Sequence, residues 1–342
     1  MNQKTKSVSN IPFSVLDLVP ITEGTTASLA IQRSLDLAKK AEAMGYNRIW
    51  FAEHHNMPGI GSAATSLIIG YVANGTTKIR VGSGGIMLPN HAPMVIAEQF
   101  GTLEALFPGR IDLGLGRAPG TDQLTTHALR RDKISGGQEF SDLLDELRYF
   151  LAPSFPGQKV RAVPGMGSTT PIWLLGSSGY SAELAGRLGL PFSFASHFAP
   201  EQLMYAIDLY KRVFQPSDVL DKPYIMLGVN LVAAETDEEA EKLATSQIVS
   251  FLGLLRGNPK PMGPPLENME GHWTPLEKSH IEQRLGSSVL GSPSTIKQKL
   301  NDFIDKTGAD ELIINTMVYD YEKRIRSYEI LSQIKKESPV MV

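Results

Sequence analysis

The chain of 342 residues contains no cysteine, which excludes disulfide bonds and metal sites with thiolate ligands. It also lacks an apolar run of the roughly 18 residues that a membrane-spanning helix requires. Residues 1–10 lack the apolar segment of a signal peptide. An excess of positive charge is also absent: 33 Lys and Arg against 36 Asp and Glu leave a net charge of −3. The composition therefore gives no sign of the basic surface that nucleic acid binding needs. We therefore expect a cytoplasmic protein that binds neither membranes nor nucleic acid.

Apolar residues make up 42% of the chain, enough for a substantial core, and their pattern alternates between strands and helices. The expected strands are 13–18, 48–52, 79–81, 111–115, 171–175, 192–195, 224–233 and 311–315. Several are continuously apolar, as in parallel sheets covered on both faces. A doubly wound open sheet would fit, but eight strand–helix units without a clear domain break favour an α/β fold of the (β/α)8 TIM barrel type.

The expected domain organisation is a single barrel over residues 11–337 with a frayed tail at 1–10. Residues 253–291 are rich in proline and glycine, so we expect a long, irregular insertion after strand 7 that forms a lid over the carboxyl ends of the strands. A polar loop is expected at 120–136, and irregular chain at 152–170.

A carboxylate and two imidazoles, Glu53, His54 and His55, follow the strand 48–52 directly. The carboxyl ends of barrel strands carry the chemistry, and a charge there is costly to bury unless it is paired or used. Neighbouring residues of an extended chain point to opposite sides, which disfavours a metal held by both histidines. Two interpretations remain open: an imidazole acid or base with Glu53 as charge partner, and a polar strand end with satisfied hydrogen bonds.

Other predicted strand ends carry glycine-rich stretches or single histidines. The stretches 82–85 and 114–120 match neither a dinucleotide fingerprint nor a P-loop. They are either turns or places where a flat ligand approaches the backbone. His91 and His197 also lie at strand ends and are weaker candidates.

Arg117 and the turn 176–181 (Gly-Ser-Ser-Gly-Tyr-Ser) together indicate an anion site. An arginine in a barrel mouth needs an anion, either Glu53 or a ligand phosphate. The turn opens a helix whose free backbone N–H groups attract anions. Ordinary capping of the helix by Ser178 or Ser181 is the alternative.

Taken together, these segments resemble the bacterial luciferase-like flavin monooxygenase family, in its single-component branch. The matching segments are 49–55 (IWFAEHH), 81–89 (VGSGGIMLP), 108–117 (PGRIDLGLGR), 176–181 and 189–191 (GLP). Their order and spacing fit across roughly residues 11–335, and the combination is specific although each segment alone is weak.

The resemblance implies a barrel that binds reduced FMN, or a reduced deazaflavin in some branches, at its C-terminal mouth. It implies a separate flavin reductase as a transient partner that supplies the reduced FMN. Helices 62–74 and 94–106 resemble the pair that forms a homodimer interface in luciferase. No metal is implied.

The resemblance also assigns site residues by position. His54 is the catalytic residue and Glu53 the neighbouring glutamate that orients it. A non-prolyl cis peptide bond is implied between Gly84 and Gly85, beneath the flavin ring. The other residues assigned to cofactor binding are Arg117, Ser177, Ser178, Gly179, Tyr180, Ser181 and Ala195.

Two departures from luciferase qualify the expected activity. Gly116 stands where luciferase has a reactive cysteine, and Gly176 where it has a glutamate. These departures affect light emission more than flavin binding. We expect a monooxygenase that uses reduced FMN and oxygen on a small apolar substrate, aldehyde- or ketone-like. The alternatives are a deazaflavin-dependent reductase or dehydrogenase and a non-catalytic flavin-binding protein. A phosphate-sugar barrel enzyme ranks last, because it would hold phosphate after strands seven and eight.

Overall fold

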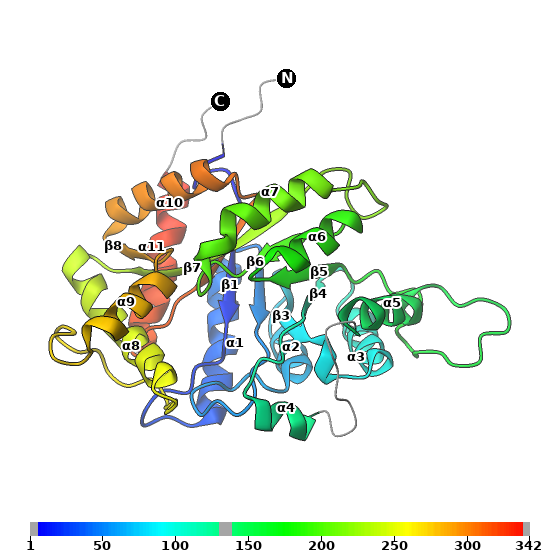
Figure 1. The fold of residues 1–342 in the computed structure, drawn as a ribbon, viewed down its shortest axis with the longest axis horizontal. Helices are drawn as coiled ribbons and strands as arrows, with labels where there is room; N and C mark the ends of the chain where they lie inside the picture. Colours follow the sequence, from blue (N-terminus) through cyan, green and yellow to red (C-terminus); the bar gives the residue numbers. More distant parts are fainter. Residues whose placement is uncertain (1–5, 130–138, 338–342) are drawn as a thin grey trace.

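The computed structural model describes residues 6–129 and 139–337, and eight parallel strands form a closed barrel at its centre (Figure 1). The barrel strands are β1 (Phe13–Asp17), β2 (Arg48–Phe51), β3 (Arg80–Met87), β4 (Ile111–Gly116), β5 (Ile172–Gly176), β6 (Phe192–Phe194), β7 (Ile225–Ala233) and β9 (Glu311–Asn315). Pairing of β9 with both β1 and β7, and of β6 with β7, closes the circle. The predicted (β/α)8 barrel is confirmed.

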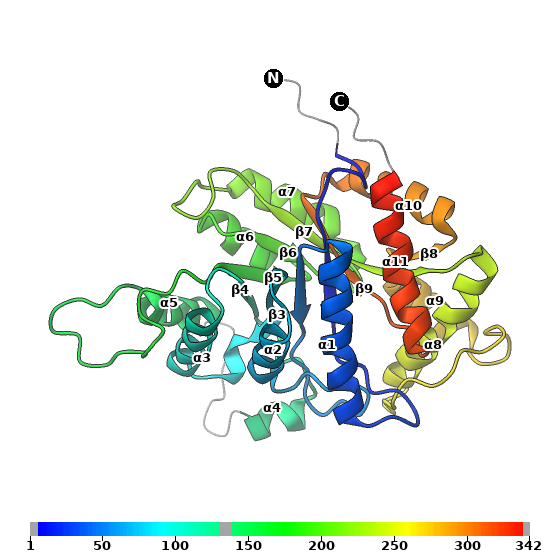
Figure 2. The same cartoon turned by 180° about the vertical axis from the view of Figure 1, so that it is seen from behind.

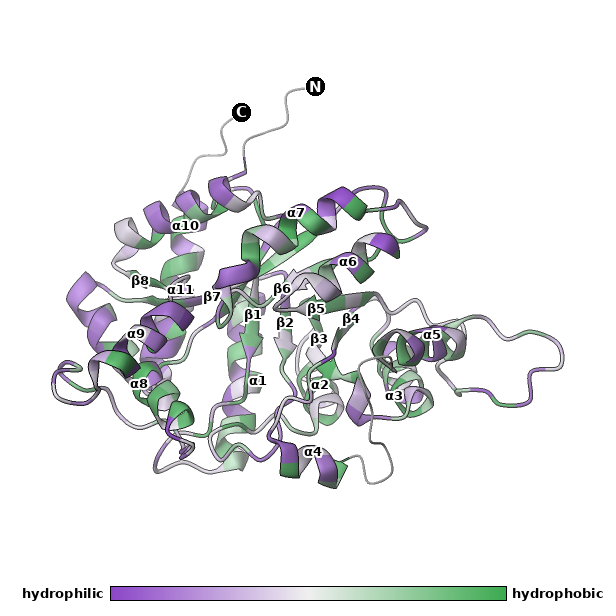
Figure 3. Ribbon diagram, viewed as in Figure 1, coloured by the Kyte–Doolittle hydropathy of each residue, from purple (hydrophilic) through white to green (hydrophobic). Residues whose placement is uncertain are grey.

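Helices follow the strands and surround the barrel. They are α1 (Ala27–Met44), α2 (Thr65–Asn74), α3 (Pro93–Leu106), α4 (Gln123–Leu129), α5 (Glu139–Leu151), α6 (Gly179–Arg187), α7 (Leu203–Val213), α8 (Asp237–Leu255), α9 (Pro275–Arg284), α10 (Pro293–Thr307) and α11 (Tyr321–Glu337), with short 3-10 turns η1 (Leu88–Asn90) and η2 (Pro200–Gln202). None of the described helices is long and apolar enough to cross a membrane. In Figure 3 the central strands are largely green, whereas α8, α9 and α10 carry purple stretches.

Local signals in the sequence explain where the longest helices begin and end. Thr26 caps α1 by accepting a hydrogen bond from the Leu29 N–H group, and Gly45 ends the helix with a φ of +86°, a conformation that favours glycine. Figure 2 shows α11 beside α1, and the Tyr321 hydroxyl donates to Asp36 at 2.6 Å between them. The last helix thereby packs against the first and completes the ring around the barrel.

The interior of the barrel is filled by side chains in layers. Its middle layer is apolar and is made by inward-pointing residues of alternate positions: Leu16, Trp50, Ala52, Trp173, Met226 and Ile313. The rings of Trp50 and Trp173 meet edge to face, with centroids 5.2 Å apart. The barrel is therefore a packed core with no open channel, as is usual for this fold.

A buried charge network closes the N-terminal end of the barrel, below the apolar layer. Nη1 of Arg48 lies 2.7 Å from Oδ2 of Asp112, and its Nε lies 2.8 Å from Oε1 of Glu311. The Arg48 side chain is 8% exposed and neither carboxylate is exposed. Arg80 adds a second cation 2.6 Å from Asp112, and the Tyr224 hydroxyl donates to Glu311 at 2.8 Å. Each charge is thus paired and hydrogen-bonded, as burial requires.

The segment 253–291 differs from the irregular chain expected for it. It contains α9 and the short strand β8 (Val289–Gly291), which pairs in parallel with the end of β7 outside the barrel. The segment also contacts the loop after β1, where the Glu23 N–H group donates to the Met262 carbonyl at 2.9 Å. This loop follows a carboxyl strand end, so the insertion borders the C-terminal mouth.

Two other segments also differ from expectation. Residues 6–10, expected to be frayed, are ordered against the barrel: Val8 is 1% exposed and the Lys6 ammonium lies 2.7 Å from Asp310. The loop expected at 120–136 includes the helix α4, and its remaining part, from residue 130, lies outside the described residues.

Candidate active site

The carboxyl ends of the barrel strands bring the predicted site residues together at one end of the molecule. Trp50 and Ala52 line the barrel interior, and alternation along the chain continues this inward direction to His54. The same alternation turns Glu53 outward, toward the chain that follows β3. The two residues therefore have different surroundings.

His54 is partly buried at the mouth, and its Nδ1 atom is buried without a hydrogen-bond partner among the described residues. Burial lowers the pKa of His54 below its ordinary value of 6.5. The imidazole is therefore neutral at pH 7, which is the state that can accept a proton.

Glu53 is fully buried, and its carboxylate accepts hydrogen bonds from four groups. Nε2 of His55 donates at 2.8 Å and Nε2 of His91 at 2.9 Å. The Asn90 side chain donates at 3.0 Å and the Met87 N–H group at 2.9 Å. Burial favours the neutral acid, but hydrogen bonds from His91, Asn90 and His55 outweigh this effect and lower the pKa of Glu53. Glu53 is thus an ionised, fully partnered carboxylate.

Within the described residues no hydrogen bond joins Glu53 to His54, because the carboxylate is used by other groups. Glu53 instead connects its own loop with η1 and with the loop that follows β4. The Thr121 hydroxyl donates to the His55 carbonyl at 2.9 Å, and the Asn90 amide donates to the Pro119 carbonyl at 2.9 Å. The cluster around Glu53 thereby positions the loop that begins with Arg117.

The Gly84–Gly85 peptide bond is cis, as the resemblance implies. Both positions are crowded: a Cβ on Gly84 would lie 2.9 Å from Leu16 Cδ1, and one on Gly85 would lie 2.8 Å from the backbone carbonyl oxygen of Gly114. The end of β3 therefore presents bare backbone at the mouth, where a flat ring could approach closely.

Arg117 lies above the first turn of α6, with its guanidinium 4.4 Å from the centroid of the Tyr180 ring. It is exposed and forms no ion pair with residues 6–129 or 139–337. Ser178 occupies the N-cap position of α6, but its side chain makes no capping hydrogen bond. The ordinary capping considered for Ser178 is therefore absent, and the N–H groups at Gly179 and Tyr180 begin a helix with a cation above it. Such an arrangement attracts anions.

The remaining predicted residues border this turn. Ser181 is buried in the first turn of α6, and Ser177 links the end of β5 to the helix. The Ala195 N–H group donates to the Gly176 carbonyl at 2.9 Å, which fixes the end of β6 beside the turn. The residues that the resemblance assigns to the cofactor phosphate therefore lie together at the ends of β4 and β5, with Ala195 beside them.

A second polar group lies at the mouth, of which the sequence indicated only His197, as a weaker candidate. His197 follows β6, and burial together with the nearby His54 lowers its pKa to about 4. Asn230 and Asn315 lie next to it on β7 and β9. The two asparagines were missed, because they carry no local signal and only the closed barrel makes them neighbours of His197.

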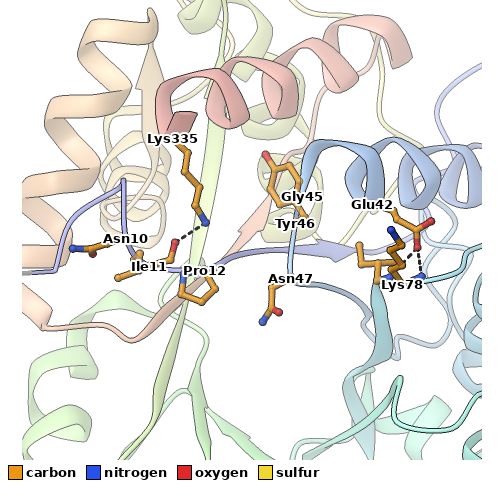
Figure 4. A pocket seen from close by; sticks show the side chains of 10 residues that line it. Asn10, Ile11, Pro12, Glu42, Gly45, Tyr46, Asn47, Lys78 and Lys335 are labelled. Carbon is orange, nitrogen blue, oxygen red and sulfur yellow. Dashed lines mark hydrogen bonds between the residues drawn. The ribbon is translucent and has the colours of Figure 1, made fainter. Parts of the chain in front are cut away.

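A depression of about 490 Å³ lies at the opposite end of the barrel (Figure 4). It is lined by residues that precede strands, such as Pro12, Asn47 and Ile79. Two of its charged side chains are engaged: Glu42 accepts from the Ile79 N–H group at 2.8 Å, and Lys335 donates to the Ile11 carbonyl at 2.9 Å. Because chemistry in this fold occurs at the carboxyl ends of strands, the depression is not the active site.

Comparison with known proteins agrees with this geometry. A family model described as luciferase-like monooxygenase matches residues 11–311. A Bacillus subtilis (strain 168) protein named YvbT is 54% identical over 325 residues, covering 95% of this chain and 96% of that protein. A luciferase-like monooxygenase of Escherichia coli (strain K12) is 50% identical over 327 residues, covering 96% and 98%. The crystal structure of apo-MsnO8 matches with a TM-score of 0.89 and 35% identity, covering 96% of this chain and all of that one. The chain therefore belongs to the luciferase-like monooxygenase family of flavin-dependent oxidoreductases.

Proposed function

We propose that this protein is a monooxygenase that uses reduced FMN and oxygen to oxidise a small substrate. One observation carries the proposal: an anion cradle, a bare glycine backbone and a neutral imidazole meet at one end of the barrel. These three features match the phosphate, the ring and the acid–base needs of a flavin reaction. Reduced FMN, when bound, supplies the electrons that activate oxygen.

In this proposal the residues of the chain have separate tasks. Arg117 and the first turn of α6 hold the phosphate, with Ser177, Ser178 and Tyr180 around it. Gly84 and Gly85 support the ring, and Ala195 borders it. His54 is the acid or base that moves a proton to or from the substrate, since its lowered pKa keeps it neutral at pH 7.

The surroundings of the mouth support oxygen chemistry. The apolar layer beneath it suits a largely apolar substrate and keeps water out of the interior. We propose that the insertion 253–291 covers the mouth as a lid, since it already contacts the loop after β1. A separate reductase would deliver the reduced flavin, because the glycine stretches of this chain do not match a dinucleotide site.

Replacing Arg117 with glutamine is expected to weaken the binding of reduced FMN roughly 10- to 100-fold, the effect of losing a charge-assisted hydrogen bond. Binding of riboflavin, which lacks the phosphate, should not change. Anaerobic titration followed by fluorescence measures both affinities. Arg187→Gln at the other end of α6 is the matched control, since Arg187 pairs with Glu183. Equal losses for FMN and riboflavin would contradict the assignment.

The same titration with a reduced deazaflavin separates the main proposal from its alternative. Tight binding of deazaflavin and none of FMN would favour a deazaflavin-dependent reductase or dehydrogenase. Tight FMN binding without substrate-dependent oxygen consumption would favour a non-catalytic flavin-binding protein.

We also propose that the protein is a homodimer, formed through α2 and α3. Leu67 on α2 is 73% exposed and Leu106 on α3 is 64% exposed, and Tyr71 and Val95 are exposed on the same two helices. Side chains of this size are usually covered when they gather on adjacent helices. Light scattering at micromolar concentration should give twice the mass of the chain, and Leu67→Glu should reduce it to the mass of a monomer. A wild-type protein of monomeric mass would refute the dimer.

A further inference from the structure

A chain of hydrogen bonds lies on the wall of the mouth that the proposed phosphate site does not use. It consists of the His197 carbonyl, Asn230 on β7 and Asn315 on β9. The Asn230 amide donates to the His197 carbonyl, and the Asn315 amide donates to Oδ1 of Asn230 at 2.9 Å. Asn230 is 1% exposed and Asn315 is 5% exposed.

The His197 carbonyl determines the donor and acceptor roles of the two asparagines. A backbone carbonyl can only accept hydrogen bonds, so Asn230 must present its NH2 group to His197 and its oxygen to Asn315. Asn315 must then use its NH2 group on Asn230. Oδ1 of Asn315 is left as an acceptor, and it is buried without a partner among the described residues. Leaving a buried acceptor unpaired costs about 1–3 kcal/mol, so such atoms usually meet a ligand or a water molecule.

The topology of the barrel indicates where this acceptor lies. Glu311, Ile313 and Asn315 alternate along β9 and share the inward direction, so Asn315 points into the barrel above the apolar layer. In the closed sheet β9 stands opposite β4, whose end carries Arg117. A flavin held by Arg117 and the end of β3 would therefore leave the side near β7 and β9 to the other reactant.

His197 occupies the same wall. A Cβ on Gly228 of β7 would collide with Nδ1 of His197, so the glycine allows the imidazole to lie directly on the strand. This Nδ1 is also buried without a partner among the described residues. The wall therefore holds a rigid polar group that no neighbouring side chain satisfies.

We propose that Oδ1 of Asn315 accepts a hydrogen bond from an N–H or O–H group of the substrate, so that the substrate is an amide- or hydroxyl-bearing molecule with an apolar remainder. This assignment rests on the proposed function, which puts the substrate in the barrel mouth. It narrows the substrate class beyond simple aldehydes and ketones, which have no such donor.

Matched probe pairs test the hydrogen bond without requiring turnover. N-Methylhexanamide carries one N–H group, and N,N-dimethylhexanamide replaces it with a methyl group. The pair 1-hexanol and 1-methoxyhexane does the same for a hydroxyl. Isothermal titration calorimetry of the FMN-saturated and the flavin-free protein measures each affinity. In the wild-type protein the donor-bearing probe of at least one pair should bind about tenfold more tightly, which corresponds to about 1.4 kcal/mol.

Variants then assign the preference to Asn315. Asn315→Leu should abolish it, because leucine has no acceptor at this position. Asn47→Leu is the matched control: it removes an amide that donates to Glu311 at the closed end of the same barrel, and it should keep the preference.

Three results would overturn the proposal: equal affinities within both pairs, no measurable binding of any probe, or a preference that persists in Asn315→Leu. Equal affinities are expected if an internal water molecule satisfies Asn315. If Asn315→Leu does not fold, the affinities of the wild-type protein for the two probes of each pair still test the proposal. A protein that does not bind FMN would refute the proposed function, while the probe preference would still be measurable without flavin.

Discussion

Replacing His54 with asparagine is expected to lower the turnover number of substrate-dependent oxygen consumption by a factor of roughly 100 to 10,000, the usual contribution of a positioned acid or base. The affinity for FMN should not change, because the proposed phosphate site is formed by other residues, at the ends of β4 and β5 and in the first turn of α6. The measurement is steady-state oxygen uptake with reduced FMN at saturating substrate. A normal turnover number in His54→Asn would eliminate His54 as the catalytic residue.

The pH profile gives the same assignment an independent test. His54 acts as a base only when neutral, and burial lowers its pKa below 6.5. Activity of the wild-type enzyme should therefore persist as the pH falls to 6.5 and decline only at lower pH, as the imidazole becomes protonated. This acid limb should disappear from the residual activity of His54→Asn. His280→Asn, which changes an exposed imidazole on α9, serves as the control and should keep the wild-type profile.

Replacing Arg48 with methionine is expected to lower the free energy of unfolding by about 3–5 kcal/mol, the cost of removing one partner from a buried ion pair. The substitution leaves Glu311 without its cation and Asp112 with Arg80 alone. Both carboxylates would remain fully buried. Equilibrium unfolding in urea, monitored by circular dichroism, measures the change.

Arg80→Met is the matched control for this prediction. Its side chain contacts the same Asp112 but is 27% exposed, so water replaces part of what is lost. We expect a clearly smaller loss of stability than for Arg48→Met. A loss in Arg48→Met no greater than that in Arg80→Met would mean that the network contributes little to stability.

The order of strands and helices could be predicted from the sequence because each element carries its own period and its own end signals. Gly45 after α1 and Gly308 after α10 are examples, and both have left-handed backbones in the structure. The end of β3 was harder to predict from the sequence. The strand was expected to stop at residue 81 but continues through the glycines to Met87. Glycine usually weakens a strand, and only close packing against β4 explains its use here.

The helix α9 was not predicted, because the high proline and glycine content of its segment outweighed a local helix-capping motif. The prolines and glycines of 253–291 suggested irregular chain, yet Thr274 and Glu277 form a capping box with Pro275 at the first helical position. That motif is readable in the sequence. The strand β8 is different, since three residues become a strand only because β7 extends beyond the barrel.

The hydrogen-bond partners of Glu53 were not predicted although the necessary rule was available. Successive residues of an extended chain point to opposite sides, and this argument separates Glu53 from His54 as well as His54 from His55. Among its actual partners, His91 is distant in sequence and directly follows η1 after β3. Asn230 and Asn315 could not be found at all, because they become neighbours only through the pairing of β7 with β9.

The charge network around Arg48 has a consequence for the order in which reactants bind and products leave. Because this network and the apolar layer above it fill the barrel, molecules reach the site only through the C-terminal mouth. Reactants that share one route of entry leave the site in the reverse order of their binding. If FMN binds with its ring over Gly84 and Gly85, and the substrate on the side of β7 and β9 stands between the ring and the opening, each exchange of spent flavin has to wait until the product has gone. The salt bridges that stabilise the fold would then also impose a sequence on the catalytic cycle.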